Sequence, residues 1–163
     1  MSFRTADLCD AFSEALQVAG PWLRDFGAAR AFRGPIATVS VLEDNALVRA
    51  ALEEEGLGRV LVVDGGGSTR CALVGDRLAA MAAERGWAGI VVNGCVRDSL
   101  ALATVPIGIK ALATSPRRPG KSGTGARDVP VEFAGVTFRP GHFLYADQDG
   151  IVVAEGDLLT SAA

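Results

Sequence analysis

The chain has 163 residues, a length that fits one domain, and 49% of its residues are hydrophobic against 21% charged. It can therefore bury a real core and has no need to be disordered. The formal net charge of -3 argues against general nucleic-acid binding, because such proteins carry a basic excess that neutralises phosphates.

The first part of the chain alternates helix and strand patterns. Leu8, Phe12 and Leu16 form an apolar stripe at helical spacing, and Gly56 supplies a left-handed helix stop. The apolar run that ends at Val63 is typical of a strand buried on both faces. Four elements are expected here: a helix over 5–18, a strand over 36–42, a helix over 44–55 and a strand over 59–63.

The second part of the chain begins with the same rhythm and ends in strands. The expected elements are a helix over 76–85, a strand over 89–92, a short helix over 98–103, a strand over 107–113, and strands over 129–133, 136–138 and 151–154. The segment 115–128 is rich in Pro, Gly and basic residues, which predicts a mobile loop and leaves a local basic patch open. A β-α-β-α rhythm with an all-β end indicates one mixed α/β domain over 1–163.

The cysteine and apolar patterns favour a cytoplasmic location. Cys9, Cys71 and Cys95 lie far apart without a CxxC spacing, which suits a reducing compartment. The N-terminus lacks the features of a signal peptide, and no apolar run approaches the roughly 20 residues that span a bilayer. The single histidine, His142, excludes most zinc sites. We therefore expect a cytoplasmic protein with no membrane partner and no direct nucleic-acid partner.

Asp64 is followed by three glycines and Ser68, a run that invites a phosphate-loop interpretation because amides freed by glycines can cradle an anion. The motif is incomplete, since a G-x-G-x-x-G pattern would need glycine at Arg70 and no Walker lysine follows. Gly120-Lys121-Ser122 ends like a Walker motif, but no strand leads into it. A glycine loop that permits close backbone approach is the favoured hypothesis.

Two further segments combine polar side chains with a favourable position. Gly75-Asp76-Arg77-Leu78 opens a predicted helix, where free amide hydrogens attract a carboxylate. On its own, Asp76 is favoured as an ordinary helix cap. Arg97-Asp98 follows a strand at its carboxyl end, where α/β sheets tend to place ligands. Arginine pairs with carboxylates and aspartate is a hard ligand for Mg²⁺, although a surface salt bridge with a helix cap explains the pair too.

Three runs of the sequence resemble the regulator of ribonuclease activity A family, which also contains the class II 4-hydroxy-4-methyl-2-oxoglutarate aldolases. They are GRVLVVDGGGS at 58–68, GCVRD at 94–98 and YADQDGI at 145–151. In that family an Asp, twenty further residues and then Arg-Asp mark members with aldolase activity, and Asp76 followed by Arg97-Asp98 matches this pattern. Members have often been called demethylmenaquinone methyltransferases, an activity for which the glycine loop lacks the nucleotide fingerprint.

The resemblance implies a fold, an assembly and a set of site residues. The fold is like the swivelling phosphohistidine domain, with β, β and α layers, and the assembly is a homotrimer or a dimer of trimers. Asp98 would anchor a divalent cation, Mg²⁺ or Mn²⁺. The keto acid would be held by the Arg97 side chain and by the amides of Gly75, Asp76, Arg77 and Leu78.

The activity implied by the resemblance is metal-dependent cleavage of 4-hydroxy-4-methyl-2-oxoglutarate, or a related 4-hydroxy-2-oxo acid, to pyruvate through a metal-stabilised enolate. Arg97 and the cation on Asp98 would stabilise the enolate charge. A water would move the proton, positioned by Asp76 or Arg97. Oxaloacetate decarboxylation is expected as a second activity, because loss of carbon dioxide passes through the same enolate.

The competing hypothesis is a protein regulator of the same family that masks ribonuclease E and has no catalytic activity. A net negative charge suits contact with a basic, RNA-binding partner. Members known only as ribonuclease regulators can lack the second Asp of the pattern, so the presence of Asp98 favours the enzyme.

Overall fold

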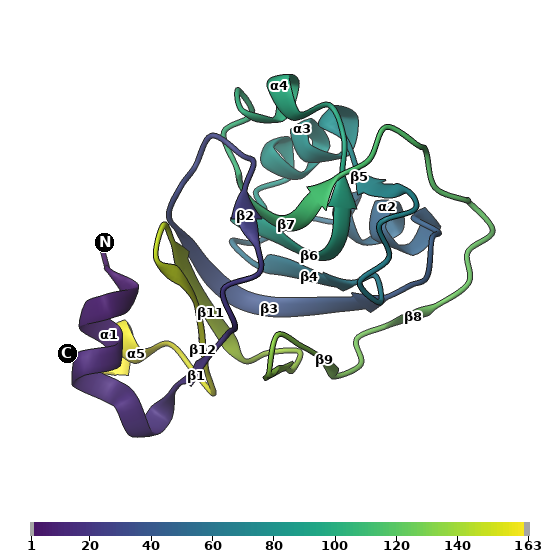
Figure 1. The fold of residues 1–163 in the computed structure, drawn as a ribbon. Coiled ribbons are helices and arrows are strands. Elements are labelled where there is room, and N and C mark those ends of the chain that lie inside the picture. Colours follow the sequence, from purple (N-terminus) through teal and green to yellow (C-terminus); the bar gives the residue numbers. More distant parts are fainter. Residues whose placement is uncertain (1, 162–163) are drawn as a thin grey trace.

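A curled ten-stranded sheet is the framework of residues 2–161, the part of the chain that this computed structural model describes. Its strands are ordered β1 (Gln17–Val18), β12 (Gly150–Ala154), β11 (Phe143–Asp147), β3, β4, β6, β7 and β2 (Arg24–Asp25). β5 (Ala72–Val74) lies beside β6, and β8 (Ala126–Arg127) lies beside β3. The central strands run parallel, namely β3 (Phe32–Ser40), β4 (Val60–Asp64), β6 (Gly89–Val96) and β7 (Gly108–Thr114) (Figure 1). Because parallel strands share one carboxyl edge, the loops that follow them collect at the same edge of the sheet.

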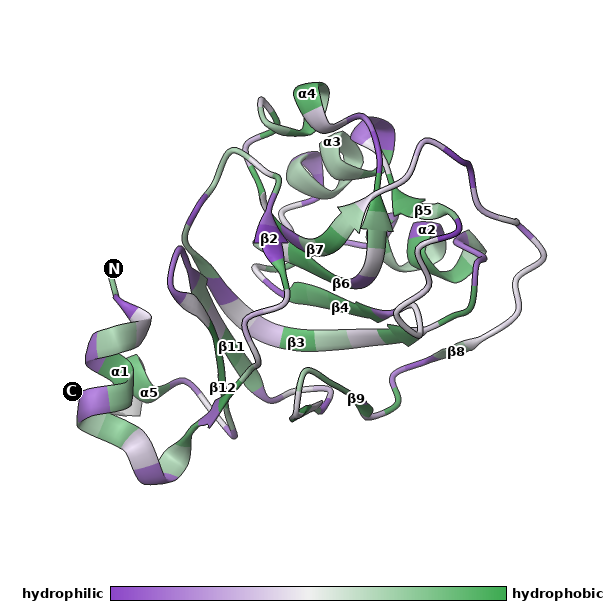
Figure 2. Ribbon diagram, in the orientation of Figure 1, coloured by the Kyte–Doolittle hydropathy of each residue, from purple (hydrophilic) through white to green (hydrophobic). Residues whose placement is uncertain are grey.

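Helices cover one face of the parallel strands. α2 (Ala46–Leu52) and α3 (Asp76–Glu84) bury their apolar sides against β4 and β6, and the short α4 (Ser99–Leu102) lies beside α3. Figure 2 shows β4 and β6 as almost continuously hydrophobic. The residues of β4 before Asp64 are fully buried, so the expectation of a strand covered on both faces is confirmed.

A second β layer covers the opposite face. β11 (Phe143–Asp147) and β12 (Gly150–Ala154) form a hairpin that continues the sheet antiparallel from β3, and β9 (Val131–Phe133) pairs with β10 (Val136–Phe138). Side chains from both hairpins pack on the apolar side of β3 and β4. The expected single mixed α/β domain with β, β and α layers is therefore confirmed.

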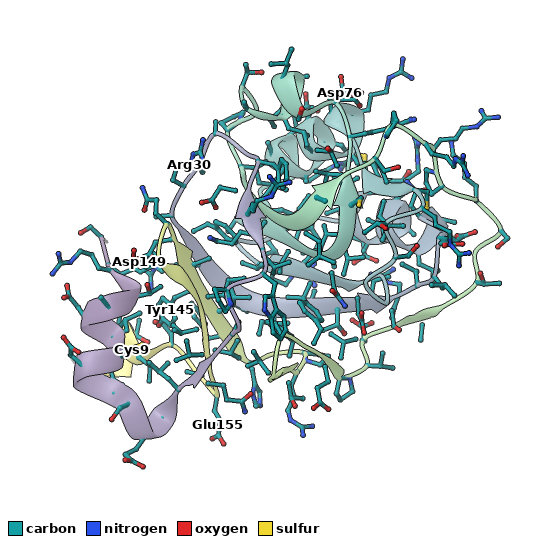
Figure 3. All side chains as sticks on the ribbon, in the orientation of Figure 1. Cys9, Arg30, Asp76, Tyr145, Asp149 and Glu155 are labelled. Atoms are coloured by element: carbon teal, nitrogen blue, oxygen red, sulfur yellow. The ribbon has the colours of Figure 1, made fainter. Side chains whose placement is uncertain are left out.

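The two ends of the described chain meet on the outer side of the curled hairpin. α1 (Thr5–Phe12) and α5 (Leu158–Ser161) lie beside each other over β11 and β12 (Figure 1). Figure 3 shows Tyr145 pointing from β11 toward α1. No helix within residues 2–161 is long and apolar enough to cross a membrane.

The helix expected over 5–18 is wrong beyond Phe12. The chain turns through Ser13–Ala15 and then forms β1 (Gln17–Val18), which pairs antiparallel with β12. Strand pairing at the sheet edge outweighs the helical spacing of the apolar residues, a case of tertiary structure overriding local preference.

Several strands are longer than expected or were not expected at all. β3 starts at Phe32, four residues before the expected strand over 36–42, so Gly34-Pro35 lies inside the strand. β6 continues to Val96 through an irregularity in its pairing with β7, as β-bulges allow. Besides β1, the strands missed were β2 (Arg24–Asp25), β5 (Ala72–Val74), β8 (Ala126–Arg127) and β11.

Replacing Tyr145 by Phe is expected to lower the free energy of unfolding by about 1–3 kcal/mol, measured by urea denaturation. The buried Tyr145 hydroxyl donates to the Asp157 carboxylate and accepts the Leu158 amide at 2.8 Å. Burial and the Asp157 carboxylate raise the pKa of Tyr145 from 10.0 to about 12. The stabilisation that comes from the raised pKa of Tyr145 is complete below pH 10 and is lost as the pH rises through about 12. The difference in free energy of unfolding between Tyr145→Phe and the parent should therefore shrink in alkali. Equal stabilities at neutral pH would contradict the assignment.

Candidate active site

A cavity of about 500 Å³ opens at the carboxyl edge of the parallel strands. Its walls come from the segments after β5 and β6, the loop after β7 and the beginning of α2. Figure 3 shows Asp76 at this edge, at the beginning of α3. The structure brings together all the residues predicted for the site, which are Gly75, Asp76, Arg77, Leu78, Arg97 and Asp98.

The beginning of α3 presents free amides to this cavity. Gly75 is the residue before the helix, and because it has no side chain it cannot cap the helix itself. Asp76 is the first helical residue, so the expectation that its carboxylate caps the helix is wrong. Within residues 2–161 the amides of Arg77 and Leu78 donate to no backbone or side-chain oxygen. A carboxylate in the cavity can accept from both.

Asp98 directs its carboxylate to the same helix end. Its backbone is left-handed (φ 61°, ψ 45°) and it precedes α4 without capping that helix. Its Oδ2 instead accepts the Asp76 amide at 3.2 Å. The Asp98 carboxylate therefore faces the start of α3 instead of capping its own helix, α4.

The segment that carries Arg97 and Asp98 comes closest to the start of α3 at Gly75. A Cβ on this residue would lie 2.7 Å from Asp98 Oδ2 and 3.4 Å from Arg97 Cγ. The Arg97 amide donates to the Val74 carbonyl at 3.0 Å, which fixes the segment after β6 beside the segment after β5. The absence of a side chain at position 75 thus lets the Asp98 carboxylate and the Arg97 stem lie directly over the helix end.

The cavity carries a local excess of positive charge although the whole chain is acidic. Its lining includes five cationic side chains, Arg49, Arg77, Arg97, Arg118 and Lys121, and two carboxylates, Asp76 and Asp98. Over residues 2–161, Arg97 has no carboxylate within ion-pair distance. The alternative of an Arg97–Asp98 surface salt bridge is therefore wrong, and the guanidinium is available to an anionic ligand.

The donor set at Asp98 fits a magnesium-type cation with an incomplete protein shell. Asp98 Oδ1 accepts no hydrogen bond from the described residues. A second carboxylate, Asp76, lies nearby at the first position of α3. Residues 2–161 contain no group of three or more His, Cys, Asp or Glu side chains that could enclose a metal. Mg²⁺ keeps several waters and is commonly held by one or two carboxylates together with an anionic ligand. A closed zinc site does not fit.

The glycine loop after β4 offers no comparable anion cradle. The amides of Gly65 and Gly67 both donate to the Asn93 carbonyl, at 3.0 and 3.1 Å, and the Gly66 amide donates to Asp64 Oδ1 at 2.9 Å. A Cβ at Gly65 would lie 2.8 Å from the Asn93 carbonyl oxygen. The hypothesis of a glycine loop required for close backbone approach is confirmed, and the amides needed for a phosphate loop are already occupied.

The buried Asp44 was expected only to begin a helix and was not predicted as a residue of the site. Its carboxylate accepts hydrogen bonds from the 120–123 part of the loop after β7, the loop that brings Arg118 and Lys121 to the cavity. Burial alone would raise the pKa of the Asp44 carboxyl, but hydrogen bonds from Ser122 and neighbouring amides outweigh burial and hold that pKa below its ordinary value. An aspartate at the carboxyl end of a parallel strand was the available signal.

The expectation of a basic patch on that loop is only partly met. Arg118 and Lys121 line the cavity, whereas Arg127 lies in β8 and pairs with Glu54 at 2.9 Å. The loop is irregular as expected, but it is anchored by Asp44 and by the pairing of β8 with β3. Arg118 and Lys121 therefore belong to the cavity, whereas Arg127 belongs to an ion pair just beyond the end of α2.

Comparison with known proteins agrees with this combination of fold and site. The model of the RraA-like family, described as Aldolase/RraA, matches residues 5–153. A protein of Laribacter hongkongensis named as a candidate 4-hydroxy-4-methyl-2-oxoglutarate aldolase is 57% identical over 98% of this chain and 100% of its own length. A protein of Alkalilimnicola ehrlichii with the same name is 58% identical over 98% of this chain and 99% of its own length.

Two solved structures superpose closely on the chain. One, from Geobacillus kaustophilus, is described as an S-adenosylmethionine:2-dimethylmenaquinone methyltransferase; it has a TM-score of 0.95 and 55% identity over 97% of this chain and 98% of that one. The other is the RNA-processing inhibitor RraA from Thermus thermophilus, with a TM-score of 0.92 and 49% identity over 96% and 94% of the two chains.

The fold and the cavity define an α/β protein with a cavity rich in cationic side chains at the carboxyl edge of a parallel sheet. The chain belongs to the RraA-like family of aldolases and ribonuclease regulators. The expected family membership is confirmed over nearly the whole sequence.

Proposed function

We propose that this protein is a divalent-cation-dependent aldolase that cleaves 4-hydroxy-4-methyl-2-oxoglutarate, or a related 4-hydroxy-2-oxo acid, to pyruvate. The observation that carries the proposal is the Asp98 carboxylate, which accepts the first amide of α3. It lies beside the guanidinium of Arg97, which forms no ion pair within residues 2–161. The names of the close relatives support the same activity.

The helix end and Arg97 would bind and orient the substrate. The carboxylate of the 2-oxo acid would accept the amides of Arg77 and Leu78, and the Arg97 fork would reach both this carboxylate and the neighbouring carbonyl oxygen. When the bond between C3 and C4 breaks, its electron pair moves into the C2–C3 unit and negative charge develops on the carbonyl oxygen. A preorganised guanidinium stabilises such charge most where it develops.

Two carboxylates would complete the chemistry. Asp98 would hold the cation, which supplies a Lewis acid at the carbonyl oxygen when bound. Asp76, at the mouth of the same helix end, would position the water that takes the proton from the C4 hydroxyl. The C4 hydroxyl becomes a carbonyl, C3 gains a proton, and two molecules of pyruvate leave. Oxaloacetate would lose carbon dioxide at the same site, because its C3–C4 bond also delivers an electron pair to C3.

The direct test is pyruvate release, followed with a coupled lactate dehydrogenase assay. We expect release from 4-hydroxy-4-methyl-2-oxoglutarate and from oxaloacetate with Mg²⁺ or Mn²⁺, and loss of release with excess EDTA. Restoring the cation should restore the rate. Release that persists unchanged in EDTA would overturn the role of the cation, and no release from either acid would overturn the proposed activity.

A second candidate function is regulation of ribonuclease E, favoured by the close structural match to an RNA-processing inhibitor. The acidic net charge of -3 suits a basic partner surface. A pull-down with purified ribonuclease E tests it. Capture that is equal for the parent protein and Asp98→Asn would place the regulatory surface outside the active site, whereas no capture would remove this candidate.

The assembly implied by the family resemblance and the cytoplasmic location expected from the cysteine and apolar patterns stay predictions. A homotrimer or a dimer of trimers would be visible in light scattering as about three or six times the monomer mass of 16.8 kDa. Fractionation of cells would test the cytoplasmic location.

A further inference from the structure

The loop after β7 is held at one point by a carboxylate that the proposed chemistry does not use. Asp44 is 3% exposed and lies between β3 and α2. Its Oδ2 accepts the Ser122 amide at 2.5 Å and the Ser122 hydroxyl at 2.7 Å, and its Oδ1 accepts the Gly123 amide at 3.2 Å. Only the fourth bond, from the Ala46 amide at 3.1 Å, belongs to the helix start. Most of its hydrogen bonds therefore reach across the fold.

The backbone on both sides of Asp44 forms hydrogen bonds with the same loop. The Gly120 amide donates to the Glu43 carbonyl at 2.8 Å, and the Asn45 amide donates to the Gly120 carbonyl at 3.1 Å. The Asn45 side chain also donates to the Leu73 carbonyl at 3.1 Å. Leu73 lies in β5, two residues before Gly75. A single three-residue turn thus ties the loop to the opposite wall of the cavity.

The turn positions two exposed, positively charged side chains. Arg118 and Lys121 line the cavity, and within residues 2–161 neither forms an ion pair. Long basic side chains on a loosely held loop would lose much of their binding energy to ordering, whereas a loop fixed beforehand avoids that cost. In the proposed function the 2-oxo carboxylate is bound at α3 and Arg97, which leaves these two cations for a different negative group.

We propose that Asp44 is a positioning residue that holds the 118–123 loop so that Arg118 binds the second carboxylate of a dicarboxylate substrate. The proposal rests on the proposed function. It makes a distinction between ligands: a dicarboxylate needs the loop, and pyruvate, which has one carboxylate, does not. Asp44 has to be a carboxylate because three N–H groups and one hydroxyl point at its two oxygens. An amide offers one oxygen and places its own donors against theirs.

The test compares Asp44→Asn with Asp128→Asn, the same chemical change at the other end of the loop. The Asp128 side chain is exposed and makes no hydrogen bond within the described chain, and its left-handed backbone (φ 57°) is one that Asn adopts readily. Trypsin cleavage after Lys121 should be about tenfold faster in Asp44→Asn and unchanged in Asp128→Asn. Equal cleavage in the parent and Asp44→Asn would overturn the anchoring role.

The kinetic arm separates positioning from general damage. In Asp44→Asn and in Arg118→Gln, the KM for 4-hydroxy-4-methyl-2-oxoglutarate should rise about tenfold or more. Exchange of the pyruvate methyl protons with D2O, followed by NMR, should change less than about twofold. A parallel loss of both activities would overturn the proposal, because it would show that the whole site is damaged.

Two further outcomes keep the test decisive. If circular dichroism shows that Asp44→Asn does not fold, Ser122→Ala takes its place. This variant removes one of the four hydrogen bonds to Asp44 and should raise the KM by a smaller factor. An unchanged KM in both Ser122→Ala and Arg118→Gln would overturn the proposal. A parent protein without turnover of any acid would instead sink the proposed function, while the trypsin comparison would still report whether Asp44 anchors the loop.

Discussion

Asp98→Asn is expected to reduce pyruvate release from both acids by at least about a hundredfold, because it removes the only carboxylate proposed to hold the cation. Asn tolerates the left-handed backbone of position 98 and its oxygen can still accept the Asp76 amide. The free energy of unfolding should therefore change by less than about 0.5 kcal/mol. Steady-state kinetics with urea denaturation measures both quantities, and Asp98→Ala should show the same loss of turnover.

The control for this change is Asp128→Asn, since residues 98 and 128 share a left-handed backbone, with φ of 61° and 57°. It should keep the parent rate. Turnover by Asp98→Asn within about threefold of the parent would contradict the assignment of Asp98. A large loss of stability in Asp98→Asn would instead mean that this carboxylate mainly supports the fold.

Gly75→Ala is expected to fold and to lose about a hundredfold in turnover. Its Cβ would lie 2.7 Å from Asp98 Oδ2, closer than any van der Waals contact, so the carboxylate must rotate away. Position 75 has an extended backbone (φ -123°) that alanine adopts freely, which leaves the fold intact. The expected signature is a lower kcat and weaker binding of Mn²⁺, measured by calorimetry.

Gly156→Ala is the matched control because a Cβ there would meet no atom within 4 Å and its backbone is not left-handed. It should leave turnover and Mn²⁺ binding unchanged. Parent-like activity in Gly75→Ala would show that the Asp98 carboxylate does not need the position it has over the start of α3.

The sequence predicted the parts of the fold whose periodicity is strong. β4 is apolar up to Asp64 and α3 is amphipathic, and both were expected at nearly their observed positions. β5 has three residues and β1 has two, so no period can emerge from them. They form because the edge of a sheet offers ladder hydrogen bonds, which only the assembled structure provides. The register of β5 beside β6 is what brings Gly75 to Asp98, and it could not be predicted from the segment itself.

The site residues, too, divide into those that the local sequence predicted and one that it did not. Arg97, Asp98 and the start of α3 were predicted from their places after strands and from the family pattern, and the structure brings them into one cavity. Asp44 was missed because an aspartate before a helix has an adequate local explanation. Its partners Ser122 and Gly123 lie 78 and 79 residues away in the chain, and no local pattern reports such a contact.

The central claim is that this site generates the enolate of pyruvate with the help of Asp98. The most direct measurement is the exchange of pyruvate methyl protons with D2O in the presence of Mg²⁺, followed by one-dimensional NMR, because it needs no knowledge of the cellular substrate. We expect the parent protein to exchange the methyl protons and Asp98→Asn to exchange them no faster than Mg²⁺ alone. Absence of exchange by the folded parent, or equal exchange by the two proteins, would contradict the claim.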